Sequence, residues 1–160
     1  MMSDLQPYCM RGHRVPALSE DLIAELAQKV CRIIGMKRSS FTRKRTEEFI
    51  MQLEDYGIHV DIVDNEEWID ATRATVDPQT AMVYLPEKLY IDLCRGKAEA
   101  IRIFLHELGH IVLGHRPLLH FSDTPATQDM DSEWQADHFA DSIIAFLKLK
   151  KEEMQLELKF

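Results

Sequence analysis

The sequence predicts an α+β fold, in which a helical domain holds a small, mainly antiparallel three-stranded sheet against one central helix. Three observations support this prediction. Apolar residues recur at helical spacing before residue 57 and after residue 132, and the period changes to two between residues 58 and 85. The stretch over residues 104–115 is apolar nearly all round, which is typical of a helix buried in the middle of a domain.

Length and composition indicate one soluble globular domain. The chain has 160 residues, 46% of them apolar and 29% charged, which is enough for a single core. No run approaches the roughly 20 apolar residues of a membrane span, and the first residues lack the apolar core of a secretory signal. Cys9, Cys31 and Cys94 form no C-x-x-C pair, so we expect reduced thiols in a cytoplasmic protein.

The chain divides into three predicted segments: a flexible N-terminal arm over residues 1–18, a single domain over residues 19–147 and a C-terminal helical tail over residues 148–160. The arm contains prolines and a glycine and shows no periodicity. Cys9 and His13 have a spacing that could reach a metal ion and cap it. An unpaired thiol and a solvated imidazole are the favoured interpretation.

Two helices follow the arm. The first begins at Ser19, a good N-cap followed by acidic residues, and ends at Gly35. The second spans residues 42–56 and ends at Gly57. A basic cluster lies at their junction, and it favours a solvated surface, with contact to an acidic partner as the alternative. The cluster consists of Lys37, Arg38, Arg43, Lys44 and Arg45.

Three strands and two helices come next. Residues 58–62 alternate in polarity, which predicts a half-buried strand. Residues 68–76 and 81–85 predict two more strands around a turn, and therefore an antiparallel hairpin. A short helix over residues 86–93 precedes the apolar helix, which starts near Ala98.

A polar loop over residues 116–131 leads to the last helix. Loops of this length are uncommon unless they bind or gate something. Ser132 is expected to begin the helix, because Ser-Glu-Trp-Gln has the form of a capping box. Ala136 and Ala140 are small, as a close contact between two helices requires.

The apolar helix carries His106, Glu107 and His110 in the order H-E-x-x-H. Four residues make about one helical turn, so both histidines lie on one face and can bind one metal ion. Glu107 lies beside the first histidine, where its carboxylate can reach a water on the metal. This motif is the signature of zinc peptidases, in which it supplies two ligands and a general base.

A catalytic zinc usually has three protein ligands, so one more residue has to supply the third. His115 lies about one and a half turns beyond His110 and points away from it, while His120 in the loop remains open. Glu133 is the stronger candidate, because it begins a helix on which Asp137 follows one turn later. Asp137 would then accept a hydrogen bond from the free ring nitrogen of a ligating histidine.

His-Glu-Leu-Gly-His, followed some twenty residues later by Glu-Trp-Gln-Ala-Asp-His-Phe-Ala, resembles the paired motifs of the ImmA/IrrE family of metallopeptidases. The resemblance covers residues 83–145. It implies zinc held by His106, His110 and Glu133, with Glu107 as the catalytic base and a short sheet beside the metal helix. It also implies a cytoplasmic regulatory role, since members cleave or relieve DNA-bound repressors, often in phages, mobile elements and stress responses.

The sequence therefore predicts a zinc endopeptidase that hydrolyses a regulatory protein such as a DNA-bound repressor. Zinc would polarise the scissile carbonyl, and Glu107 would transfer the proton. A free edge of the strand at residues 81–85 would bind an extended substrate by strand addition. An oxyanion donor is also expected; the candidates are Tyr84, Tyr90, His115, Arg116 and His120.

Two alternatives to the zinc endopeptidase belong to other functional classes of protein. The first is a zinc-containing regulatory protein that docks a partner, through the arm or the tail, without cleaving it. The second is a metal-free helical domain whose histidines are packed core residues, which requires the two motifs and the apolar flanks to coincide by chance. A net charge of −8 and the lack of a helix-turn-helix argue against direct binding to nucleic acid, and no membrane partner is expected.

Overall fold

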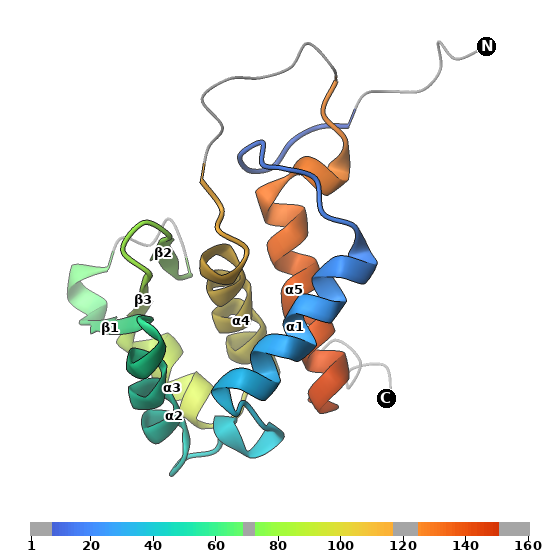
Figure 1. Ribbon diagram of the computed structural model, residues 1–160. Coiled ribbons are helices and arrows are strands. Elements are labelled where there is room, and N and C mark those ends of the chain that lie inside the picture. Colours follow the sequence, from blue (N-terminus) through green and yellow to red (C-terminus); the bar gives the residue numbers. More distant parts are fainter. Residues whose placement is uncertain (1–7, 69–72, 117–124, 151–160) are drawn as a thin grey trace, which may run out of the picture.

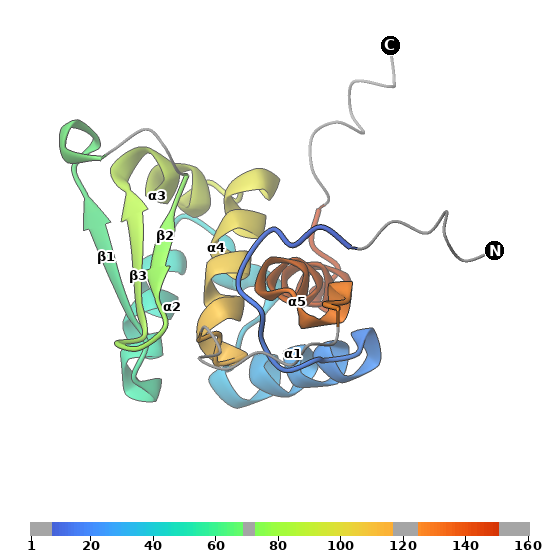
Figure 2. The same cartoon turned by 90° about the horizontal axis from the view of Figure 1, so that it is seen from above.

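The computed structural model describes residues 8–68, 73–116 and 125–150. A three-stranded sheet lies on one side of the molecule, and α4 (Ala98–Val112) stands between that sheet and the helices α5 (Ser132–Leu147) and α1 (Glu20–Ile34) (Figures 1 and 2). Helix α4 contacts α5, α3 (Glu87–Cys94) and the strand β2. The predicted α+β class is confirmed.

The sheet is mixed rather than mainly antiparallel. Its strands are β1 (His59–Val63), β2 (Thr75–Asp77) and β3 (Met82–Pro86), in the order β1-β3-β2. The expected hairpin is present, because β2 pairs antiparallel with β3, but β1 pairs parallel with β3. Residues 64–81 are long enough to carry the chain back to the end of the sheet where β1 began, as a parallel pair requires.

Two predicted elements are shorter in the structure. The second strand, expected over residues 68–76, comprises Thr75–Asp77, and residues 69–72 of that range lie outside the described residues. The helix expected over residues 42–56 consists of α2 (Thr46–Leu53) continued by one 3-10 turn.

The ends of α1 are those that the sequence predicts. Ser19 accepts a hydrogen bond from the Leu22 amide at 3.2 Å, and Gly35 closes the helix in the left-handed conformation at φ 71°. The end of α5 differs from the prediction, since Lys148 adopts φ 57° and the helix stops at Leu147. The expected helical tail therefore does not continue α5, and residues 151–160 lie outside the described part of the chain.

The core fills the space between the sheet and the three helices. Val83 and Leu85 of β3 are fully buried, as are Phe104 on α4 and Phe139 on α5. Each buried side chain of this size contributes roughly 1.5–3 kcal/mol relative to exposure. Burial of residues such as Phe104, Leu105 and Leu108 packs α4 in the core, which positions the side chains of its buried face. No helix among the described residues has the length and apolarity needed to cross a bilayer.

Candidate metal centre

Helices α4 and α5 approach closely because small residues line their contact. Ala136 and Ala140 are fully buried, and a Cβ added to Gly109 would lie only 3.0 Å from a ring carbon of Phe139. Gly109, the fourth residue of the H-E-x-x-H motif, therefore lets the aromatic ring pack directly on the α4 backbone. This close contact brings polar side chains of the two helices within bonding distance.

His106 and His110 on α4 and Glu133 on α5 form one cluster, in which the potential ligand atoms all lie within 4.8 Å of one another. The two carboxylate oxygens of Glu133 lie 3.0 Å from the Nε2 atoms of His106 and His110 respectively. Those two Nε2 atoms are 3.2 Å apart. The structure thus brings together the three residues expected to bind a metal, and this group could hold an ion.

Asp137 lies behind His106. Its carboxylate oxygen is 2.8 Å from Nδ1 of His106, which can therefore donate its proton there and keep Nε2 toward Glu133. Burial acts to lower the pKa of His106, but the hydrogen bonds with Asp137 and Glu133 outweigh it and raise that pKa to about 9. Arg11, from the N-terminal segment, lies 3.0 Å from the other oxygen of Asp137.

His115 and Gln135 lie behind His110. The Nδ1 atoms of His110 and His115 are 2.8 Å apart, and Nε2 of His115 is 2.7 Å from the side-chain oxygen of Gln135. Burial lowers the pKa of His115 to about 4, so this imidazole is neutral near pH 7. The expectation that His115 points away from His110 is wrong, because the two rings are in contact, but among the described residues His115 is not part of the metal-ligand group.

The donor set has the chemistry and spacing of a metal site. If Nδ1 of each ligating histidine donates to its outer partner, both Nε2 atoms present lone pairs to each other and to the Glu133 carboxylate. Three acceptors at 3.0–3.2 Å need positive charge between them, either a proton or a cation. Two Zn–N bonds of about 2.05 Å at a tetrahedral angle place their nitrogens roughly 3.3 Å apart. The 3.2 Å separation of the His106 and His110 nitrogens thus allows both to bind one metal ion.

Glu107 lies beside this cluster but does not belong to it. The side chain lines the same cavity as His110 and Glu133, and it has no hydrogen-bond partner within the described residues. Burial raises the pKa of Glu107, although the neighbouring His106 and His110 oppose that shift. A half-buried carboxylate with a raised pKa and free oxygens is suited to accept a proton from a water molecule.

The cavity has a volume of about 250 Å³ and is bounded by three parts of the chain. β2 and its flanks form one wall, α4 and α5 form another, and the N-terminal segment contributes the side chain of His13. The lining residues are His13, Ala74, Thr75, Val76, Pro78, Glu107, His110, His115 and Glu133. His13 is exposed, as expected of a solvated imidazole, and it also lines this cavity, whereas Cys9 is exposed and does not line it.

Most of the expected oxyanion donors lie elsewhere. Tyr84, Tyr90 and Arg116 do not line the cavity, and His120 lies outside the described residues. His115 lines it but already bonds to two buried side chains. The expected substrate edge is also wrong, because β3 is the central strand and both its edges are paired. Beside the cavity lies β2, which pairs with no described strand other than β3.

Residues 8–18 run along the start of α5, where Asp131 joins the two segments. Its buried carboxylate accepts hydrogen bonds at 2.7–3.0 Å from the Tyr8 hydroxyl and from the amides of Arg11, Gly12 and Glu133. Asp131 is therefore the N-cap of α5 in place of Ser132, and the expected capping box is absent because the Gln135 side chain bonds elsewhere. A carboxylate can accept more hydrogen bonds than a hydroxyl, which favours Asp131 over Ser132 as the N-cap of α5.

Asp131 and Gln135 were not expected at the site, and His13 was considered only as a possible metal contact beside Cys9, with a solvated imidazole favoured. Asp131 was visible only as the residue before a predicted N-cap, and Gln135 only as part of that cap. His13 lies in an aperiodic segment more than a hundred residues from the motif, so no spacing rule relates it to the metal helix. The H-E-x-x-H motif identifies its own helix but gives no information on which distant segment covers it.

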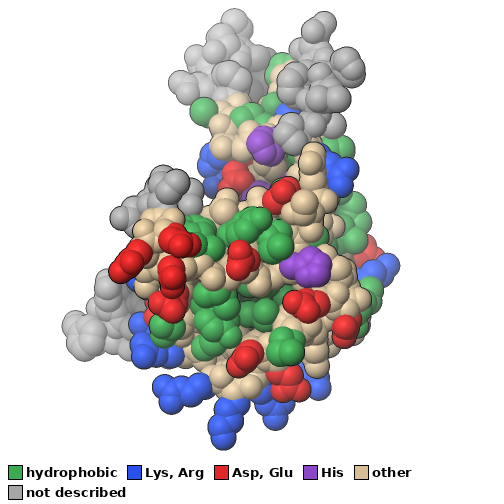
Figure 3. All heavy atoms as spheres, turned by 90° about the vertical axis from the view of Figure 1, so that its left-hand side faces the viewer, with side chains coloured by type: hydrophobic (Ala, Val, Ile, Leu, Met, Phe, Trp, Pro, Cys, Tyr) green, Lys and Arg blue, Asp and Glu red, His purple; other side chains and the backbone are tan. Residues whose placement is uncertain are grey.

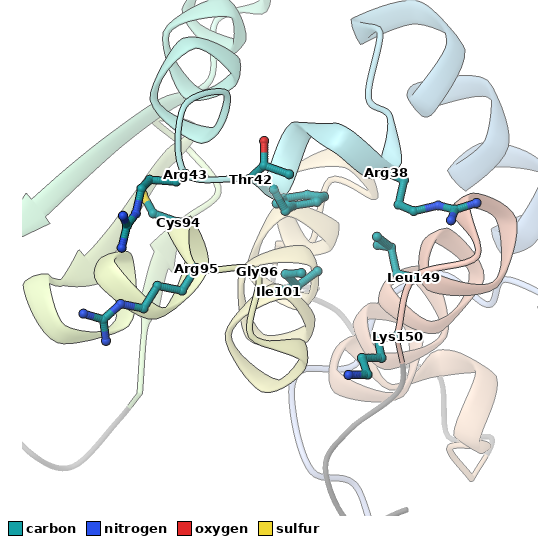
Figure 4. Close-up of a pocket in the computed structure, with 10 residues that line it drawn as sticks. Arg38, Thr42, Arg43, Cys94, Arg95, Gly96, Ile101, Leu149 and Lys150 are labelled. Carbon is teal, nitrogen blue, oxygen red and sulfur yellow. The ribbon is translucent and has the colours of Figure 1, made fainter. Parts of the chain in front are cut away.

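A second cavity of about 470 Å³ lies at the other end of α4, lined by Phe41, Ile101 and several cations (Figure 4). Its basic residues are Arg38, Arg43, Arg95 and Lys150, and all four are exposed. On the sheet side of the molecule, acidic side chains are scattered across the face while basic ones gather along the lower edge (Figure 3). The basic cluster at the α1–α2 junction is therefore a surface feature.

Comparison of the chain with protein-family models, with curated proteins and with solved structures found no match in any of the three. The resemblance to the ImmA/IrrE family therefore remains a prediction based on the two motifs. The geometry of the α4–α5 cluster is independent of that resemblance, because it follows from the packing of this chain alone.

Proposed function

We propose that this protein is a zinc-dependent endopeptidase of the ImmA/IrrE type that hydrolyses a regulatory protein, such as a phage or mobile-element repressor. One observation carries the proposal. Three side chains that could bind a metal converge, and two of them, His110 and Glu133, line a cavity together with Glu107, a carboxylate with no hydrogen-bond partner among the described residues. A purely structural metal site has no need of such a group, whereas hydrolysis requires a base.

His106, His110 and Glu133 would hold the zinc. Bound there, zinc would supply a Lewis acid for the scissile carbonyl and would acidify water. Glu107 takes a proton from the attacking water and gives it to the nitrogen of the leaving amine. Asp137 keeps His106 oriented through its Nδ1 proton, at the 2.8 Å distance between these groups.

His13 is the candidate for stabilising charge on the carbonyl oxygen. His13 lines the cavity and its side chain is exposed, while its backbone is fixed by two hydrogen bonds to Ser132, at 2.9 Å from its amide and 3.0 Å to its carbonyl. A donor held on a fixed backbone is preorganised for this role. We expect His13→Ala to lower kcat by about a hundredfold without loss of zinc.

The substrate would bind as an extended strand along β2. This strand pairs only with β3 among the described strands, and its residues Thr75 and Val76 line the cavity. Backbone hydrogen bonds to a free edge bind a peptide with little regard to sequence, so specificity would come from side-chain contacts in the cavity. An extended segment of a protein fits this edge better than a small molecule.

The proposal is tested with Glu107→Gln, which removes the base but no ligand. Zinc content should match wild type, while cleavage of a library of proteome-derived peptides, followed by mass spectrometry, should fall by about 10²- to 10⁴-fold. Glu48→Gln, an exposed position on α2, is the matched control and should retain full activity.

The same variant also separates cleavage from docking. Used as bait in a lysate, the zinc-loaded Glu107→Gln protein should retain a substrate that wild type then cleaves. If wild type and Glu107→Gln release a captured partner equally and without cleavage, the protein is a docking regulator. If purified wild type contains no stoichiometric metal at neutral pH and takes up none, the zinc site is refuted.

A further inference from the structure

A chain of buried side chains connects His110 to the backbone. Gln135, His115 and His110 are 0%, 2% and 7% exposed, so water cannot replace the hydrogen bonds between them. We propose that Gln135 and His115 form a positioning relay that holds His110 in the tautomer whose Nε2 faces the metal. This inference rests on the metal site of the proposed function and assigns roles to two residues that bind no metal themselves.

The direction of the relay is set at its backbone end. The side-chain nitrogen of Gln135 lies 2.9 Å from the carbonyl oxygen of Pro16 and 2.7 Å from that of Asp129. Carbonyl oxygens only accept hydrogen bonds, so both contacts require the NH₂ group of Gln135. The amide oxygen of Gln135 must therefore point the other way, toward His115.

From that oxygen the proton positions follow in order. The Gln135 oxygen is an acceptor, so Nε2 of His115, at 2.7 Å, must carry a proton and donate. A neutral imidazole carries only one proton, which leaves Nδ1 of His115 as an acceptor. The neighbouring Nδ1 of His110, at 2.8 Å, must then be the donor. The lone pair of His110 is left on Nε2, the atom that faces Glu133 and His106.

The two ligating histidines are thus oriented by different means. His106 donates to the carboxylate of Asp137, a charged acceptor that would accept its proton in any arrangement. His110 donates to a neutral imidazole, which can act as donor or acceptor at either nitrogen. A neutral partner fixes a tautomer only when its own proton is fixed, and the carbonyls of Pro16 and Asp129 do this through Gln135. The N-terminal segment therefore contributes to the metal site through Pro16.

Two substitutions of His115 separate the relay from simple packing. Asn keeps an acceptor oxygen where Nδ1 of His115 lies, whereas Phe fills the volume of the ring but cannot accept. We expect His115→Phe to weaken zinc binding by about 10- to 100-fold and His115→Asn to stay within a few-fold of wild type, by competition with a chromophoric chelator. If His115 only fills space, the order reverses, with Phe closer to wild type. Thermal unfolding of both metal-free variants shows whether each is folded.

A spectroscopic measurement tests the tautomers directly in the wild-type protein. In the zinc-loaded form, ¹⁵N-labelled histidine side chains should show protons on Nδ1 of His110 and on Nε2 of His115. A proton on Nδ1 of His115 overturns the relay, even if the variants bind zinc weakly. Because neither readout uses a peptide substrate, zinc-loaded protein that shows these tautomers but cleaves nothing refutes the peptidase and retains the relay. The reversed tautomer in an active enzyme refutes only the relay.

Discussion

The two cavities at opposite ends of α4 are both lined by charged side chains, but they differ in how those side chains are held. At the metal centre, His106, His110 and Glu133 each have a bonded partner, and the partners are buried or half-buried. At the basic cavity the cations are exposed, and those of Arg38 and Arg43 form no ion pair with any described residue. The candidate metal centre therefore differs from the basic cavity because its side chains combine imidazoles with a carboxylate and each is held in one orientation by a bonded partner.

Removing one charge from each cavity gives the largest expected contrast. Glu133→Gln deletes a metal ligand, and since loss of an outer partner costs 10- to 100-fold in affinity, loss of a ligand should exceed about 100-fold. Arg95→Gln, the matched change in the basic cavity, should leave zinc affinity unchanged. Isothermal titration with zinc measures both. If the Glu133→Gln protein bound zinc as tightly as wild type, Glu133 would not be a ligand and the two cavities would not differ in zinc binding.

The hydrogen bonds by which Asp131 joins the N-terminal segment to α5 should give the next largest effect when they are weakened. Asp131→Asn keeps the size of the side chain but weakens four hydrogen bonds, so the free energy of unfolding should fall by roughly 3 kcal/mol at pH 7. Burial acts to raise the pKa of Asp131, but hydrogen bonds from Arg11, Tyr8 and neighbouring amides lower it overall.

The lowered pKa fixes the pH dependence of that loss. A carboxyl group whose pKa is lower in the folded state stabilises the fold above its unfolded pKa of about 3.9 and loses this contribution as pH falls through the folded pKa. Urea unfolding of wild type and Asp131→Asn should therefore differ most at neutral pH and converge below about pH 4. A difference that is constant from pH 7 to pH 3 would show that the charge of Asp131 is not involved.

Gly12→Ala tests how closely the N-terminal segment fits against the ligand helix. An added Cβ would clash with Oγ of Ser132 and lie 2.7 Å from Cγ of Glu133. The segment or Glu133 must shift, so we expect a loss of roughly 1–3 kcal/mol in unfolding free energy together with weaker zinc binding. Ala17→Val enlarges a side chain at an exposed position of the same segment, so it should change neither the unfolding free energy nor the zinc affinity. Unchanged zinc affinity in Gly12→Ala would show that Glu133 does not depend on this contact.

The smallest effect is expected at the basic cavity. The double variant Arg38→Gln/Arg43→Gln should change the unfolding free energy by no more than about 0.5 kcal/mol, because both side chains are exposed. Peptide cleavage should be unaffected as well. A large loss of stability or activity would show that these cations have a partner or role that the isolated chain does not reveal.

Local chemistry made much of the fold predictable. The N-cap at Ser19 and the left-handed Gly35 follow from neighbouring residues, and so do the hairpin and the start of α4. The sequence predictions were wrong where segments far apart in the chain contact the same backbone or side-chain groups. Asp131 replaced Ser132 as the cap of α5 because the N-terminal segment brings three more donors to its carboxylate. The parallel pairing of β1 has the same origin, since strand order depends on contacts across the whole sheet.

The sequence alone determined which face of α4 carries the two candidate metal ligands, because a helical repeat fixes His106 and His110 one turn apart wherever the helix lies. It also indicated Glu133 as the third ligand, through its helix position and a family resemblance. Only the tertiary structure decided what surrounds that face: His13 in the cavity, β2 beside it, and Gln135 and His115 behind His110. These contacts join residues far apart in the chain, and no local periodicity encodes a distance between segments that meet only when the core has packed.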